Sequence, residues 1–111
     1  MNVTYSRAVA ESGPDYQLIE QATRVLERDV LGKSAPKVSA AWDRLDAADG
    51  YPTYTLRLTD ATGETTGRFT PVELRSDGKV ELRLRFLWDD LLRISLHRYL
   101  DNLHEGEGDA A

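Results

Sequence analysis

The sequence predicts an α+β domain: an antiparallel four-stranded meander sheet with an N-terminal and a C-terminal helix packed on one face. Apolar residues recur every three or four positions over 14–31 and again over 89–104, which is typical of amphipathic helices. Between these segments, short runs alternate apolar and polar residues and are separated by Gly-containing turns, which is typical of strands joined by hairpins. Strands in series with a helix at each end indicate a layer of helices on a sheet.

Length and composition narrow the protein class. We place a single domain at 1–104 and expect the acidic, Gly-rich tail at 105–111 to be disordered, since it cannot bury apolar surface. The 111 residues include no cysteine, and the net charge of -5 disfavours nucleic acid, whose affinity comes largely from phosphate neutralisation. The chain has no apolar run of the length of a signal peptide or membrane span, so we expect a cytoplasmic protein with no membrane partner.

The N-terminal part is expected to contain one helix, over 14–31. Residues 2–10 alternate weakly through Val3 and Tyr5, so they form either a short edge strand, the fifth of the sheet, or a loose arm. Ser12 followed by Asp15 resembles a capping box, and Gly32 supplies the left-handed residue that ends the helix.

The first hairpin follows after residue 37. Residues 38–43 and 54–59 both carry their apolar side chains at even positions, and a turn ending at Gly50 connects the two runs. This turn pairs Trp42 with Leu56 and Ala40 with Leu58, which places both apolar sets on one face.

The next segment, 65–74, allows two interpretations. Phe69 is the only large apolar residue of the run 65–70, and Pro71 cannot donate to a sheet ladder, so a bulge, a bend or a break is expected there. Thr70 with Glu73 three residues later is also the pattern that starts a helical turn.

The last part of the chain is predicted to be a hairpin strand followed by a helix. Ser76 to Gly78 reads as a hairpin turn, and the alternation over 79–87 predicts the fourth strand. Asp89 is then the N-cap of the C-terminal helix. The apolar stripe of this helix is expected to face the sheet and comprises Trp88, Leu92, Leu96, Tyr99, Leu100 and Leu103. The predicted core unites Trp42, Leu56, Leu82, Leu84, Leu92 and Leu96.

Arginines form the first candidate binding site. If 79–87 is a strand, Arg83 and Arg85 share the outer sheet face with Arg57, and Arg75 lies nearby. Such a face suits a phosphate, a carboxylate-rich partner or a strand of RNA, because guanidinium groups bind oxyanions in a fork geometry. It lacks the aromatic residues that stack bases in sheet-type RNA binders. The alternative is a solvated face with cross-strand ion pairs, each worth well under about 1 kcal/mol.

The aromatic residues Trp42, Tyr54 and Trp88 form the second candidate, a pocket between sheet and helices. His97, Asp101 and His104 share one helix face at a spacing compatible with zinc, but this face is opposite the apolar stripe, so we predict no metal site. No phosphate-binding glycine motif and no nucleophile elbow occurs, so no catalytic residue and no cofactor is assigned.

These features favour a non-enzymatic protein–protein interaction module, adaptor-like or chaperone-like. Its expected partner is another protein or a second copy of the chain, as a homodimer. The alternative is a small-molecule or anion-binding domain that uses the pocket between sheet and helices. No motif of a known family is recognised.

Overall fold

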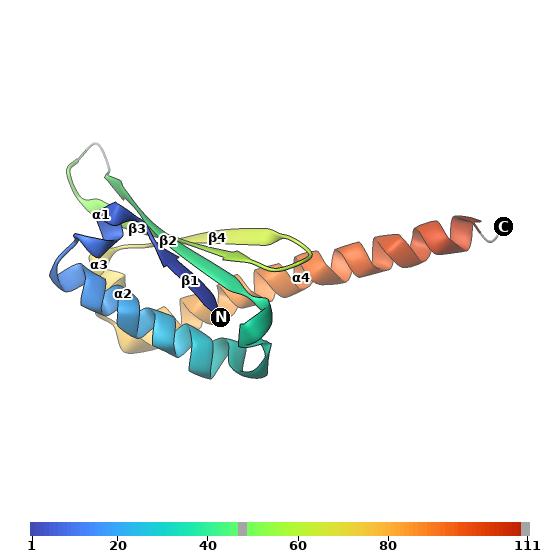
Figure 1. Cartoon of the computed structure of the whole chain (residues 1–111), viewed down its shortest axis with the longest axis horizontal. Helices are drawn as coiled ribbons and strands as arrows, with labels where there is room; N and C mark the ends of the chain where they lie inside the picture. Colours follow the sequence, from blue (N-terminus) through green and yellow to red (C-terminus); the bar gives the residue numbers. More distant parts are fainter. Residues whose placement is uncertain (47–48, 110–111) are drawn as a thin grey trace.

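The computed structural model describes residues 1–46 and 49–109, except for the side chains of residue 77 and of residues 102–109. The fold is α+β, with a four-stranded sheet and helices packed on it (Figure 1). The strands are β1 (Asn2–Tyr5), β2 (Ser39–Asp46), β3 (Pro52–Thr59) and β4 (Glu64–Phe69). The helices are α1 (Arg7–Ala10), α2 (Pro14–Val25), α3 (Pro71–Leu74) and α4 (Asp77–Asp109), and α2 continues through π-helical residues Leu26–Leu31 and 3₁₀-helical residues Gly32–Lys37.

The sheet is mixed, so the prediction of a purely antiparallel meander is wrong. Its strand order is β1-β2-β3-β4, and β1 pairs in parallel with β2. The physical reason is the connection: α2 and its extension lie between β1 and β2, and a helical crossover of this length joins parallel strands. Residues 2–5 are therefore an edge strand, one of the two alternatives that the sequence allows.

The central hairpin has the predicted register. Trp42 pairs with Leu56 and Ala40 with Leu58 across β2 and β3. Gly50 adopts the expected left-handed conformation, with φ of 83°. Strand alternation and one glycine turn are local signals, and here they were sufficient.

Helix α2 begins at Pro14 as predicted, and with its π-helical continuation to Leu31 it covers the predicted range 14–31, but its N-cap differs from the prediction. Gly13, not Ser12, is the N-cap and makes no side-chain cap hydrogen bond. The Ser12 hydroxyl donates instead to the carbonyl of Val9 at 2.6 Å, and Asp15 accepts from a tyrosine of β3, so the predicted capping box is wrong. Gly32 has the expected positive φ, 53°.

Of the two interpretations of the segment after β4, the structure has the helical turn, α3. Thr70 caps α3: its hydroxyl accepts from the backbone N–H of Glu73 at 3.2 Å, and the Glu73 carboxylate accepts from the backbone N–H of Thr70 at 3.2 Å. Pro71 occupies the first position of the turn, where its missing N–H costs nothing.

The largest correction concerns residues 79–87, which form the first part of α4 and no strand. Leu84 and Leu87 are buried at a spacing of three, while Leu82 and Phe86 are 53% and 59% exposed. The buried set Val80, Leu84, Leu87 and Leu91 follows helical periodicity, which the alternation of the same segment masks. Because Leu, Glu, Arg and Lys are good helix formers, the helix runs on without a junction, and the predicted hairpin at 76–78 and N-cap at Asp89 are absent.

The core lies between the inner face of the sheet and the helices. Trp42, Leu56 and Leu84 are buried there, as predicted. Leu82, Leu92 and Leu96 are not: they are 53%, 45% and 57% exposed. The buried apolar residues of the sheet are Ala40, Trp42, Tyr54, Leu56, Leu58 and Phe69.

Helix α4 is too long for the sheet to cover. Its 33 residues span about 50 Å at about 1.5 Å per residue. An eight-residue strand such as β3 spans roughly 26 Å at about 3.3 Å per residue. The C-terminal half of α4 therefore projects beyond the body (Figure 1), and the molecule measures 59 × 32 × 22 Å.

The predicted domain boundary and the membrane prediction can be compared with this fold. The boundary at residue 104 falls inside α4, whose backbone is helical to Asp109, and the disorder of the tail stays a prediction. Among the described residues, no helix combines the length and the apolar character that a membrane span needs.

Candidate functional site

The three aromatic residues of the predicted pocket do not line an opening together. Trp42 and Tyr54 are 1% and 0% exposed, and Trp88 packs half-buried at the edge of the core. The indole Nε1 of Trp42 donates to the Thr23 hydroxyl at 3.0 Å. Trp42 and Tyr54 are thus packed in the core, and a role in ligand binding stays a prediction.

Tyr54 is tied to α2 by its hydroxyl, which donates to the Asp15 carboxylate at 2.7 Å. Burial raises the pKa of Tyr54, and the hydrogen bond to Asp15 raises it further because it favours the protonated phenol. The contact joins β3 to the first turn of α2, so both groups serve the packing of helix on sheet.

The four predicted arginines lie on different elements: one on β3, two on α4 and one at the end of α3. Arg57 lies on β3 and points to the outer sheet face, where it is the only one of the four. Arg83 and Arg85 lie on α4, because residues 79–87 are helical. Arg75 follows α3 as its C-cap. A role for each in binding stays a prediction, but Arg83 and Arg85 do not lie on a strand, so they are not part of the outer sheet face that carries Arg57.

Arg83 makes the strongest contacts of this group. Its guanidinium donates to the Glu73 carboxylate, and its Cζ lies 4.7 Å from the centroid of the Phe69 ring. Burial raises the pKa of Glu73, but the hydrogen bond from Arg83 and those from Thr70 outweigh it and leave the pKa lowered. Arg83 thus joins α4 to α3 and β4.

Arg85 is engaged more weakly on the helix surface. Its Nη2 donates to the Glu81 carboxylate at 2.8 Å, an i,i+4 pair, and to the backbone carbonyl of Asp29 at 3.2 Å. The second contact links α4 to the π-helical end of α2, and both charged side chains are about half exposed.

The apolar side chains of the projecting half of α4 are uncovered. Leu92, Leu96, Tyr99 and Leu100, called the α4 stripe below, are 45%, 57%, 61% and 50% exposed. Their spacing of four, three and one residues places them along one side of the helix. The sequence predicts this stripe but assigns it to the core, because periodicity does not show how far the sheet extends.

A hydrogen-bonded cluster holds α4 at the point where it leaves the body. The Asp60 carboxylate accepts from the backbone and hydroxyl of Thr62, at 2.8 and 2.5 Å, and the Thr62 hydroxyl lies 2.6 Å from that of Ser95. Burial raises the pKa of Asp60, but these hydrogen bonds outweigh it and lower the pKa. A Cβ on Gly63 would lie 2.8 Å from Ile94, so the turn and the helix pack closely.

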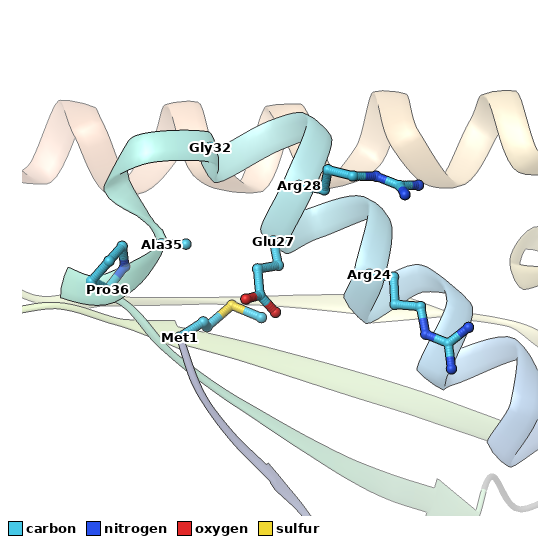
Figure 2. Close-up of a pocket in the computed structure, with 7 residues that line it drawn as sticks. All are labelled: Met1, Arg24, Glu27, Arg28, Gly32, Ala35 and Pro36. Atoms are coloured by element: carbon cyan, nitrogen blue, oxygen red, sulfur yellow. The ribbon is translucent and has the colours of Figure 1, made fainter.

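The wide π-helical turn after α2 forms one side of a hollow of about 590 Å³ (Figure 2). Figure 2 shows the Glu27 side chain directed at Met1, while Arg24 and Arg28 point away from Ala35. Arg24 lies 3.8 Å from the Glu20 carboxylate and Arg28 lies 3.5 Å from that of Asp29. The two arginines at this hollow are paired and exposed, and they point away from Glu27 and Met1, so the charges do not converge on one ligand position.

The histidine face of α4 can be described only in part. His97 is exposed, and the side chain of His104 lies outside the described residues. Among the described side chains, no three His, Cys, Asp or Glu residues are grouped so that they could hold a metal ion.

Comparisons with protein-family models, with curated proteins and with solved structures find no match for this chain.

Proposed function

We propose that the chain is a non-enzymatic protein–protein interaction module that self-associates through the α4 stripe. The exposure of Leu92, Leu96, Tyr99 and Leu100 on a projecting helix is the observation that carries the proposal. Monomeric proteins rarely expose contiguous apolar patches larger than a few hundred Å², and the largest apolar patch on a protein often marks an interaction site.

A second copy is the occupant that fits this surface. In a two-fold dimer the same patch meets itself, so a stripe of leucines and a tyrosine is its own complement. Leu92, Leu96 and Tyr99 follow the four–three spacing of a coiled-coil seam. An antiparallel arrangement opposes the two helix dipoles and puts the two bodies at opposite ends, because α4 projects from each body (Figure 1).

The expected affinity is modest. Two stripes bury on the order of 600 Å² of apolar surface, which at about 25 cal/mol per Å² gives roughly 15 kcal/mol before association costs of about 4–15 kcal/mol. An interface of this size belongs to the weak and transient class, below about 1,200 Å². We therefore expect a monomer–dimer equilibrium in the micromolar range.

Sedimentation velocity over a concentration series tests the proposal. Leu96→Glu places a charge in the stripe, and His97→Glu adds the same charge one residue away on the polar side of the helix. The parent and H97E should dimerise with similar affinity. L96E should remain monomeric at concentrations at least tenfold above those at which the parent dimerises. A parent that is monomeric throughout, or equal loss in both variants, would refute the proposal.

A further inference from the structure

The outer face of the sheet carries a second, polar surface that is unrelated to α4. Its side chains come from the strand positions that alternate with the core residues, and they are exposed or half-exposed. Strand pairing arranges them in rows across the sheet. The central row consists of Thr4, Ala41, Arg57 and Thr66.

Ala41 makes a depression in this row. Its two neighbours across the strands, Thr4 and Arg57, have backbones roughly 10 Å apart, since adjacent strands are about 4.8 Å apart. A methyl group fills little of that space. The result is a hollow of about 120 Å³, whose walls include Asn2, Thr4, Ser39, Arg57 and Thr59.

The walls of this hollow supply hydrogen-bond donors and no carboxylate. Thr4, Ser39 and Thr59 each have a hydroxyl, Asn2 has an amide, and Arg57 has a guanidinium. Several donors that line one hollow and include one arginine match an oxyanion such as phosphate, which accepts hydrogen bonds at several oxygens. We propose that this hollow binds the phosphate group of a small phosphomonoester.

Arg57 is available for this role. Its Nε lies 3.9 Å from the Glu64 carboxylate, at the outer limit of an ion pair, and both side chains are more than half exposed. Such a pair contributes little and leaves the two terminal nitrogens to donate to another oxyanion. Glu64 also weakens phosphate binding, because its negative charge lies on the same side of the sheet.

The rest of the ligand lies over the adjoining hollow. This second hollow, about 360 Å³, shares Thr4, Ala41 and Arg57 with the first and extends to Asp43 and Thr55. Asp43 can accept from hydroxyl groups, and Thr55 can donate or accept. The arrangement fits a phosphomonoester whose organic part carries hydroxyl groups, such as a sugar phosphate or glycerol phosphate.

An NMR titration of the labelled full chain tests the site. Inorganic phosphate and glycerol 3-phosphate are the probes, and sodium chloride at equal ionic strength controls for salt. Amide shifts should concentrate at Thr4, Ala41 and Arg57 and saturate, with glycerol 3-phosphate binding more tightly than phosphate. Sodium chloride should not reproduce them.

Three variants make the titration decisive. Arg57→Gln should weaken binding about tenfold or more, since a charge-assisted contact is lost. Glu64→Gln should strengthen binding about twofold, because a nearby negative charge is removed. Arg68→Gln removes a positive charge from the same sheet face outside both hollows, so it should weaken binding by no more than about twofold. Shifts that do not saturate, or equal weakening in R57Q and R68Q, would overturn the proposal.

Discussion

The helical state of residues 79–87 can be tested with two leucines that are two positions apart. Leu84→Ala removes a side chain that is 0% exposed, whereas Leu82→Ala removes one that is 53% exposed. In a strand both would lie on the same face, and both substitutions would empty the core. In α4 they lie on nearly opposite sides, so the two costs must differ.

The structure fixes the expected magnitudes. Leu84→Ala leaves a cavity among packed side chains and should cost about 2–5 kcal/mol of unfolding free energy. Leu82→Ala should cost less than about 1 kcal/mol, since half of the side chain already contacts water. At about 4 °C per kcal/mol for a domain of this size, the melting temperature should fall by roughly 8–20 °C for L84A and by less than about 4 °C for L82A.

Urea unfolding followed by tryptophan fluorescence measures both costs, because Trp42 is buried in the native state. If L84A is too unstable to fold, Leu84→Val keeps most of the volume and should still cost more than L82A. Equal losses of stability in L82A and L84A would refute the helical assignment and restore the strand.

Three other predictions follow from contacts around α4. Arg83→Ala should lower the free energy of unfolding by about 1–3 kcal/mol, measured by thermal melting, since it leaves the half-buried Glu73 carboxylate without its charged partner. A change below about 0.3 kcal/mol would show that the ion pair contributes nothing. The pKa of Asp60 is lowered in the folded state, so Asp60 stabilises the fold above its ordinary pKa of 3.8, and this contribution is lost as the pH falls through the folded pKa. Asp60→Asn should therefore reduce the loss of stability that the protein shows below about pH 4. An unchanged loss in this variant would contradict the prediction. Gly63→Ala should lower the melting temperature, because its Cβ would lie 2.8 Å from Ile94, and an unchanged melt would show that the turn can move away.

Local signals were enough to predict part of the fold. The pairing of Trp42 with Leu56 depends on strand alternation and on one glycine turn, and both are readable within twenty residues. Parallel pairing of β1 was not readable, because it depends on where the chain returns after α2. Residues 79–87 fit two periods at once: Val80 and Leu84 belong both to an alternating set and to a helical one.

In the candidate surfaces, too, local features could be predicted from the sequence and features that depend on the tertiary fold could not. The α4 stripe is visible in the sequence as a helical repeat, but its exposure follows from the length of α4 relative to the strands. Arg57 was assigned to the outer sheet face correctly because its strand was correct, whereas Arg83 and Arg85 were misplaced with theirs. The hollow over Ala41 needs three strands side by side, including β1, for which the sequence allowed an edge strand but did not predict parallel pairing with β2.

The central claim, that the α4 stripe meets itself in a second copy, can be tested by cross-linking single cysteines. The chain has no cysteine, so Leu96→Cys and His97→Cys each introduce a unique thiol. A short bifunctional maleimide, which reacts with both thiols and tolerates small differences in register, is added to each variant at micromolar protein concentration. We predict a covalent dimer for L96C that does not form after dilution to nanomolar concentration, and little or none for H97C. Equal cross-linking of the two variants, or none for L96C at any concentration, would contradict the claim.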